Sequence, residues 1–62
     1  MRHDEFEGIC KALGSGEEKL LKHIVTHQVG KVVACNREEE FFEVDVDGNR
    51  KTWSKENCKI LQ

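Results

Sequence analysis

Hydrophobic positions follow a helical spacing at the start of the chain and alternate with polar positions towards its end. Within residues 4–13 the apolar side chains stand three or four residues apart, which is typical of one face of an amphipathic helix: Phe6, Ile9, Cys10 and Leu13. The acids of the first turn complement the helix dipole, and a Gly-Ser-Gly triplet follows the last apolar position. We therefore predict a first helix over residues 4–13 that ends at Gly14.

A second helix is predicted over residues 17–26. Ser15 and Glu18 have the spacing of a capping box, in which each side chain accepts a hydrogen bond from the backbone N–H of the other residue. Glu18 and Lys22 add an ion pair at i,i+4. The apolar stripe of this helix consists of Leu20, Leu21, Ile24 and Val25. Residues 1–28 are thus expected to form a helical N-terminal segment.

After Gln28 the spacing becomes that of β-strands. Residues 29–35 are rich in β-branched side chains and predict one strand. Residues 41–47 predict a second strand, because apolar residues alternate there with acids. Asp47-Gly48-Asn49 is typical of a tight hairpin turn, and it leads into a return strand over residues 50–53.

The hairpin turn also predicts a register. A two-residue loop places Trp53 on the same face as Phe42, Val44 and Val46, and it brings Arg50 opposite the acids. A three-residue loop would move Trp53 to the acidic face, so we favour the two-residue loop. Residues 54–57 then predict a single helical turn, and residues 58–61 a short closing strand.

The order of these elements resembles the small SH3-like or Tudor-like β-barrels. The resemblance covers residues 29–61: a Val-Gly-Lys-Val-Val strand, an alternating strand that ends at Asp-Gly, a return strand, a Ser-Lys-Glu-Asn turn and an apolar last strand. It implies a small antiparallel sheet or partial barrel. This stretch leaves room for four short strands, where the family usually has five, and the chain has no Tyr for the aromatic cage that Tudor modules use.

We therefore predict an α+β fold in one domain, with two short N-terminal helices (1–28) packed on a small SH3-like sheet or partial barrel (29–62). The alternative is an open three-stranded sheet with one helix across it. A chain of 62 residues buries only about 60% of the surface that its unfolded form exposes, and it hardly encloses a cleft. We accordingly expect no enzymatic activity and no cofactor.

Charge and cysteine usage narrow the class of protein further. The formal net charge is −2 and both halves are nearly neutral, which argues against a basic nucleic-acid-binding surface. The apolar stretches are too short to span a bilayer, and we expect no signal peptide and no membrane partner. An odd number of cysteines argues against a disulfide framework, so we expect reduced, buried thiols in the cytoplasm: Cys10, Cys35 and Cys58.

Six acids without an intervening Lys or Arg mark the region of the predicted hairpin: Glu38, Glu39, Glu40, Glu43, Asp45 and Asp47. They suit the docking of a basic partner, or they form a solvated face that keeps an edge strand from pairing. Phe41 lies on the acidic side of its strand, where it covers the barrel end, packs under the first helix or marks a binding patch. The first hypothesis is a non-enzymatic module that binds a protein, or a second copy, through an exposed Phe41 and the acids of the hairpin: Glu43, Asp45 and Asp47.

Two alternatives rest on other residues. Lys51, Lys55 and Lys59 recur every four residues and, with Arg50, could contact nucleic acid. His23 and His27 stand at i,i+4 on the predicted second helix, a spacing that lets two imidazoles hold one metal ion. With Cys35 and Cys58 they would form a zinc-stabilised domain; otherwise they are two partly exposed histidines near a helix C-terminus.

Overall fold

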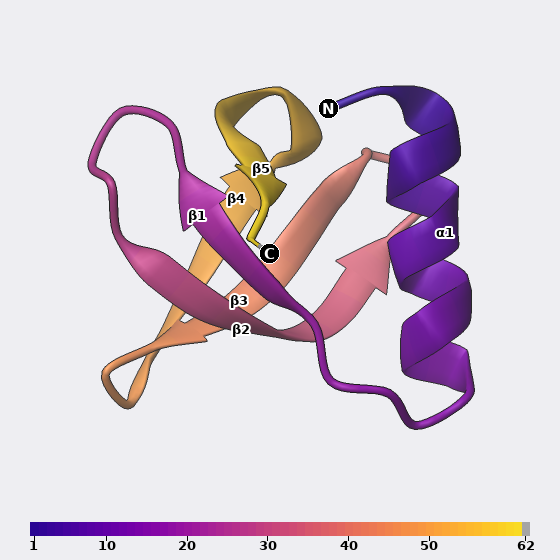
Figure 1. Ribbon diagram of the computed structural model, residues 1–62, viewed down its shortest axis with the longest axis horizontal. Helices are drawn as coiled ribbons and strands as arrows, with labels where there is room; N and C mark the ends of the chain where they lie inside the picture. The colour runs from indigo at the N-terminus through magenta and orange to yellow at the C-terminus, as the bar shows by residue number, and fades with distance from the viewer. Residues whose placement is uncertain (62) are drawn as a thin grey trace.

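The computed structural model describes residues 1–61 as one helix and a five-stranded antiparallel sheet (Figure 1). The elements are α1 (His3–Gly14), β1 (Leu20–His23), β2 (Val29–Asn36), β3 (Phe41–Val46), β4 (Asn49–Ser54), the 3-10 turn η1 (Lys55–Asn57) and β5 (Cys58–Ile60). The strand order is β4-β3-β2-β1-β5, so the last strand pairs with the first. The extents of 24 × 23 × 22 Å are nearly equal, because the sheet curls around its core.

The first predicted helix is confirmed, with bounds that differ from the prediction by one residue at each end. α1 buries the apolar face that the sequence indicates, and the Phe6 ring lies 4.9 Å from the ring of Phe42 on β3. The chain takes a left-handed backbone conformation after the helix, at Gly16, with φ 82°. Ser15 closes the helix, since its N–H donates to the Lys11 carbonyl. The helix therefore docks on the sheet through Phe6 and its neighbours on that face.

The second predicted helix, over residues 17–26, is wrong. Residues 20–23 form β1, in which Leu21 is fully buried and Leu20 is 46% exposed. Leu21 pairs with Gly30 on one side and with Ile60 on the other, so two backbone ladders replace the hydrogen bonds of a helix. Helix propensity is a weak local preference, and tertiary pairing overrides it here. The fold thus has one N-terminal helix, and the alternative of an open three-stranded sheet is also wrong.

The predicted hairpin of β3 and β4 is confirmed in type and register. Phe42 pairs with Trp53 and Asp45 pairs with Arg50. Asp47 and Gly48 both have positive φ, at 52° and 85°, as a two-residue turn with a matching twist requires. The Gly48 N–H donates to the Asp45 carboxylate at 3.0 Å. Trp53 is consequently buried on the same face as the valines of β3.

One core serves the helix and the sheet. α1 contributes Phe6, Ile9 and Cys10, and the concave face of the sheet contributes Leu21, Val32, Phe42, Val44, Val46, Trp53 and Cys58. The ladder between β2 and β3 shifts register between Val32 and Ala34, a β-bulge that increases the local twist. The sheet alone supplies most of the buried apolar side chains, and α1 closes one side of it (Figure 1).

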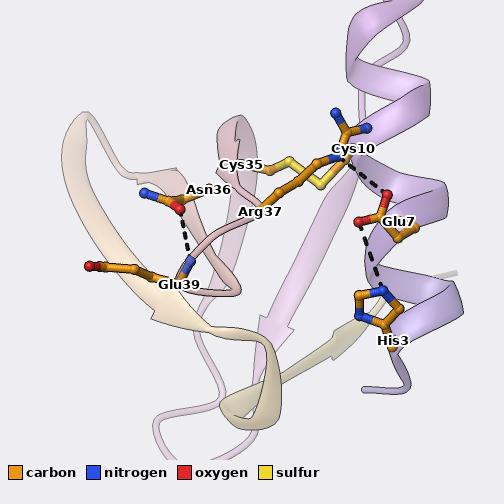
Figure 2. Close-up of a disulfide and its surroundings, with 7 residues drawn as sticks. All are labelled: His3, Glu7, Cys10, Cys35, Asn36, Arg37 and Glu39. Carbon is orange, nitrogen blue, oxygen red and sulfur yellow. Dashed lines mark hydrogen bonds and ion pairs between the residues drawn. A yellow bond between two sulfur atoms is a disulfide. The ribbon is translucent and has the colours of Figure 1, made fainter.

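The expectation of three reduced cysteines is wrong. Cys10 on α1 and Cys35 on β2 form a disulfide, with 5.8 Å between their Cα atoms (Figure 2). They stand 25 positions apart and meet only because α1 packs against β2. Cys58 keeps a free, buried thiol that donates to the Ser54 carbonyl at 3.3 Å. Within residues 1–61, α1 is too short to cross a membrane.

Candidate interaction surfaces

The predicted acidic hairpin surface is largely balanced by neighbouring cations. Asp45 lies between Lys31 on β2 and Arg50 on β4, with which it pairs in register. A carboxylate oxygen of Glu43 lies 3.7 Å from a guanidinium nitrogen of Arg50. Asp47 is exposed in the turn. The outer face of β2, β3 and β4 therefore presents mixed charge instead of a uniformly negative field.

Phe41 is half-buried, where the sequence hypothesis treats it as exposed. It is the first residue of β3 and lies between Asn36 and Ser54 on the neighbouring strands. The next strand position, Phe42, points into the core. Phe41 thus remains partly accessible at the end of the sheet that α1 covers, beside the turn that carries Glu38 and Glu39.

The four cations of the nucleic-acid hypothesis lie on three different elements. Arg50 and Lys51 are successive residues of β4, so their side chains point to opposite faces. Lys55 belongs to η1, where its side chain is only 12% exposed and its ammonium lies 2.9 Å from the Glu40 carboxylate. Lys59 pairs with Lys22 on β1. The four-residue recurrence does not create a common helical face, because these residues are not on one helix.

The contact between Lys55 and Glu40 belongs to a small network that joins three elements. The hydrogen bond from Lys55 is the main reason that the pKa of the Glu40 carboxyl lies below its usual value of 4.5. The His3 ring lies 3.7 Å from Glu40. It also lies 4.0 Å from Glu7, whose carboxylate lies 3.3 Å from Arg37 (Figure 2). This network fastens the N-terminal end of α1 to the β2–β3 turn and to η1.

The proposed zinc ligands are not brought together as a set. His23 ends β1, and its Nδ1 accepts hydrogen bonds from the N–H groups of Val25 and Thr26, so the imidazole shapes the following turn. The same ring meets Trp53 edge-on at 5.0 Å. His27 lies in the turn with φ 61°, and Cys35 is bonded to Cys10. Among residues 1–61 no group of three or more metal-ligating side chains is found.

A surface that the sequence analysis missed lies on the other half of the sheet. Within residues 1–61, all large hydrophobic side chains that are strongly exposed belong to β1, the turn after it, β2 and the C-terminal end: Leu20, Ile24, Val25, Val29, Val33, Ile60 and Leu61. Leu20 lies opposite Lys31 and therefore diagonally from Val29 and Val33 on the outer face. The Leu61 N–H donates to the Leu20 carbonyl, which places Leu61 beside Leu20.

This outer face is positively charged at its margin. Lys22 and Lys59 pair with each other across β1 and β5, and Lys31 lies opposite Leu20. Residues 19–37 contain three lysines and one arginine but no acid. We call this the lysine-rimmed apolar surface and define it by Leu20, Lys22, Val29, Lys31, Val33, Lys59 and Leu61.

Acids from outside the acid-free stretch reach this surface at Lys31, which also lies opposite Asp45 on β3. Glu18 binds the Lys31 ammonium at 2.8 Å, and this hydrogen bond raises the pKa of Lys31 above its usual 10.5 while it lowers the pKa of Glu18. The sequence indicates this surface through its acid-free stretch. The net charge of each half of the chain hides that stretch, because acids elsewhere in the same half cancel its lysines.

No pocket is found among residues 1–61. Comparison with known protein families, with curated proteins and with solved structures finds no match to this chain. Inference about function therefore begins from the surfaces described above.

Proposed function

We propose that the chain is a non-enzymatic interaction module that binds another protein through the lysine-rimmed apolar surface. The observation that carries the proposal is the one-sided distribution of exposed apolar side chains: within residues 1–61 none of the strongly exposed ones lies on α1, β3 or β4. Contiguous exposed apolar patches with a polar rim are typical of protein interaction sites. Removal of such an apolar surface from water by a partner stabilises the complex.

The charges favour a partner whose own surface is acidic around an apolar centre. Lys22, Lys31 and Lys59 would face carboxylates in such a complex, which increases the rate of association and its specificity. A symmetric pair of identical chains would instead place this lysine-bearing face against an identical lysine-bearing face. The homodimer expected as one possibility from the sequence is therefore disfavoured on this face.

Two matched variants test which surface binds. The wild-type chain first recovers partner proteins from cell extract. These partners are then titrated against Lys22→Glu/Lys59→Glu and against Glu43→Lys/Asp45→Lys, a control in which two acids of the hairpin are reversed in charge. We expect the first variant to weaken binding at least tenfold and the second to leave it within twofold. Equal binding by both variants would contradict the proposal.

The acidic hairpin with Phe41 is the second candidate surface for the same function. It is supported by the exposed carboxylates of Asp45 and Asp47 and by the partial exposure of Phe41. If the Glu43→Lys/Asp45→Lys variant alone loses the partner, the hairpin and not the lysine-rimmed apolar surface is the binding site.

Nucleic-acid binding is tested in parallel. Single-stranded and duplex DNA and RNA are titrated at low salt against the same two variants and against Lys51→Glu. Nucleic-acid binding would replace the proposal if it falls as the salt concentration rises and if Lys22→Glu/Lys59→Glu or Lys51→Glu weakens it. Such salt dependence is expected because lysines that contact phosphates displace bound counterions.

We also propose that the sheet belongs to the SH3-like class. Two features support this assignment: β1 supplies the fifth strand that residues 29–61 lack, and the 3-10 turn η1 precedes a last strand that returns to pair with the first. A solved structure of the chain, compared with SH3-like barrels, tests it.

We keep a cytoplasmic location as a proposal, although the disulfide replaces the reduced thiols on which it first rested. Stable structural disulfides are rare in the reducing cytoplasm, whereas disulfides that sense or respond to redox conditions do occur there. The location therefore requires that the bond between Cys10 and Cys35 be one that cellular dithiols reach and reduce.

A further inference from the structure

The disulfide lies where the helix meets the sheet. Cys10 projects from α1, and Cys35 stands one residue before the end of β2 (Figure 2). The cross-strand partner of Cys35 is Phe42, whose ring packs against Phe6 of α1. The covalent link therefore stands beside the aromatic contact through which the helix covers this end of the sheet.

Most other attachments of α1 are exposed and weak. The ion pair of Glu7 with Arg37 and the contact of His3 with Glu40 are solvent-accessible, and surface contacts of this kind contribute little to stability. The N-terminal amine donates to the Lys55 carbonyl at 3.0 Å. A Gly-Ser-Gly segment, residues 14–16, joins the helix to the sheet and allows a hinge. Besides the disulfide, the burial of Phe6 and Ile9 is the main interaction that keeps α1 in place.

The sheet does not need the helix for its own ladder. All five strands pair through their backbones without any contribution from α1. The sheet also brings its own buried cluster: Leu21, Val32, Val44, Val46, Trp53 and Cys58. Detachment of α1 would expose Phe42 and leave this pairing intact.

The three cysteines differ in burial. Cys10 is buried, whereas Cys35 is half-buried near the end of β2, so we take Cys35 as the point of attack for an external thiolate. Cys58 is fully buried, and its thiol donates to the Ser54 carbonyl. Cys58 is therefore not placed to exchange with the pair, and the two bonded cysteines act as a separate redox unit.

We infer that the bond between Cys10 and Cys35 is a redox latch: the oxidised pair holds α1 over Phe42, and reduction lets the helix detach while the sheet stays folded. In the reduction, a thiolate of an external dithiol attacks the Cys35 sulfur, the bond between Cys35 and Cys10 breaks, and Cys10 leaves as a thiolate that takes up a proton. The second thiol of the reductant attacks the mixed disulfide. The reductant leaves as a cyclic disulfide and Cys35 as a thiol, so two electrons and two protons enter the protein.

The reduced state presents a different surface from the oxidised one. Phe42 and Phe6, packed together in the oxidised protein, become accessible on the inner face of the sheet, opposite to the face on which Phe41 lies. This apolar surface lies at the end of the sheet under α1, away from the lysine-rimmed apolar surface on β1, β2 and β5. The latch therefore does not depend on the proposed function.

Amide hydrogen exchange of the full-length wild-type chain, with and without dithiothreitol, tests the latch. A disulfide that closes a loop of this length restricts the open state strongly, so we expect exchange in α1 to become on the order of 100-fold faster after reduction. Amides of β3 and β4 should change by less than threefold. Removal of the reductant in air should restore the slow exchange in α1.

Two variants complete the test. Cys10→Ser/Cys35→Ser without reductant should match the reduced wild-type chain, and Cys58→Ser should keep the response to dithiothreitol. Loss of protection in all strands after reduction would overturn the latch and make the bond a general staple of the fold. Unchanged exchange in α1 would overturn it as well, and both results come from the wild-type chain even if a variant fails to fold.

Discussion

Gly30 on β2 lies against the indole of Trp53 on β4, two strands away across the core. A Cβ atom at position 30 would come within 3.1 Å of the Trp53 Cη2 atom and within 3.0 Å of the Val44 Cβ atom. The missing side chain is what lets β2 curl tightly over the β3–β4 hairpin. The glycine of the Val-Gly-Lys-Val-Val strand is thus required for packing and not for an unusual backbone conformation.

Replacement of Gly30 by Ala should destabilise the fold. The added methyl group meets the Cβ of Val44, which is tied to the backbone of a central strand and has little room to yield. Overpacking of this kind typically costs about 1–3 kcal/mol. Urea unfolding followed by Trp53 fluorescence measures the change, and a free energy of unfolding equal to that of the wild-type chain would show that the core relaxes without cost.

Replacement of Gly8 by Ala should have the opposite effect. Gly8 is an exposed residue inside α1, and a Cβ there meets nothing within 4 Å. Alanine is favoured over glycine in a helix interior by about 1 kcal/mol. We expect a stabilisation of roughly 0.5–1 kcal/mol in the same urea experiment, so this variant is the matched control for Gly30→Ala.

Charge reversal at Arg50 should cost more than at the adjacent Lys51. Arg50 pairs with Asp45 and lies 3.7 Å from Glu43, whereas the cross-strand partner of Lys51 is Val44. Arg50→Glu would place like charges across two strands, which destabilises by up to about 1 kcal/mol. Urea unfolding at low and high salt checks this, because the difference between the two variants should shrink as salt screens the repulsion.

The Cys58 thiol should remain un-ionised well into the alkaline range. Burial raises its pKa from the usual 9.0 to about 11, against a smaller opposite effect of the N-terminal positive charge. At pH 8 the thiolate fraction is then about 100-fold lower than in the unfolded chain. With Cys10 and Cys35 bonded, iodoacetamide reports on Cys58 alone, and alkylation should be at least 100-fold slower in buffer than in urea.

The same shift predicts the sign of the pH dependence of stability. Because the folded pKa is raised, the stabilising effect of the buried neutral thiol is complete below pH 9 and is lost as the pH rises from about 9 to about 11. A Cys58→Ala variant should lack this part of the alkaline fall in the free energy of unfolding. An identical fall in both chains would exclude Cys58 as its cause.

The β3–β4 hairpin could be predicted because all its determinants are neighbours in the sequence. Asp47 and Gly48 tolerate positive φ, the alternation of residues 41–46 selects one face, and these two features together leave one register. The first helix was predictable for a similar reason, since its apolar spacing and its acidic first turn agree. Of the residues proposed for binding, Phe41, Glu43 and Asp45 lie on β3 and Asp47 lies in the turn, but the pairing of Asp45 with Lys31 was not foreseen.

Residues 20–25 show where local pattern failed. Leu20, Leu21, Ile24 and Val25 fit a helical stripe, yet Leu21 alone enters the core and the other three are exposed. Residues 20–23 form a strand because β2 and β5, at Gly30 and Ile60, offer backbone hydrogen-bonding groups on both sides of β1. No window of neighbouring residues contains that information. The zinc hypothesis failed with the helix, because the spacing of His23 and His27 had meaning only there.

By itself, the sequence determined the elements whose causes are local: the first helix, the alternating strands, the tight turn and the burial of Trp53. Only the tertiary structure decided that residues 20–23 pair as a strand, that Cys10 and Cys35 bond, and that lysines gather with exposed apolar side chains on one face. The physical reason is distance along the chain. Backbone pairing, disulfide bonding and surface charge depend on groups that the folded sheet brings together, and neighbouring residues alone do not specify them.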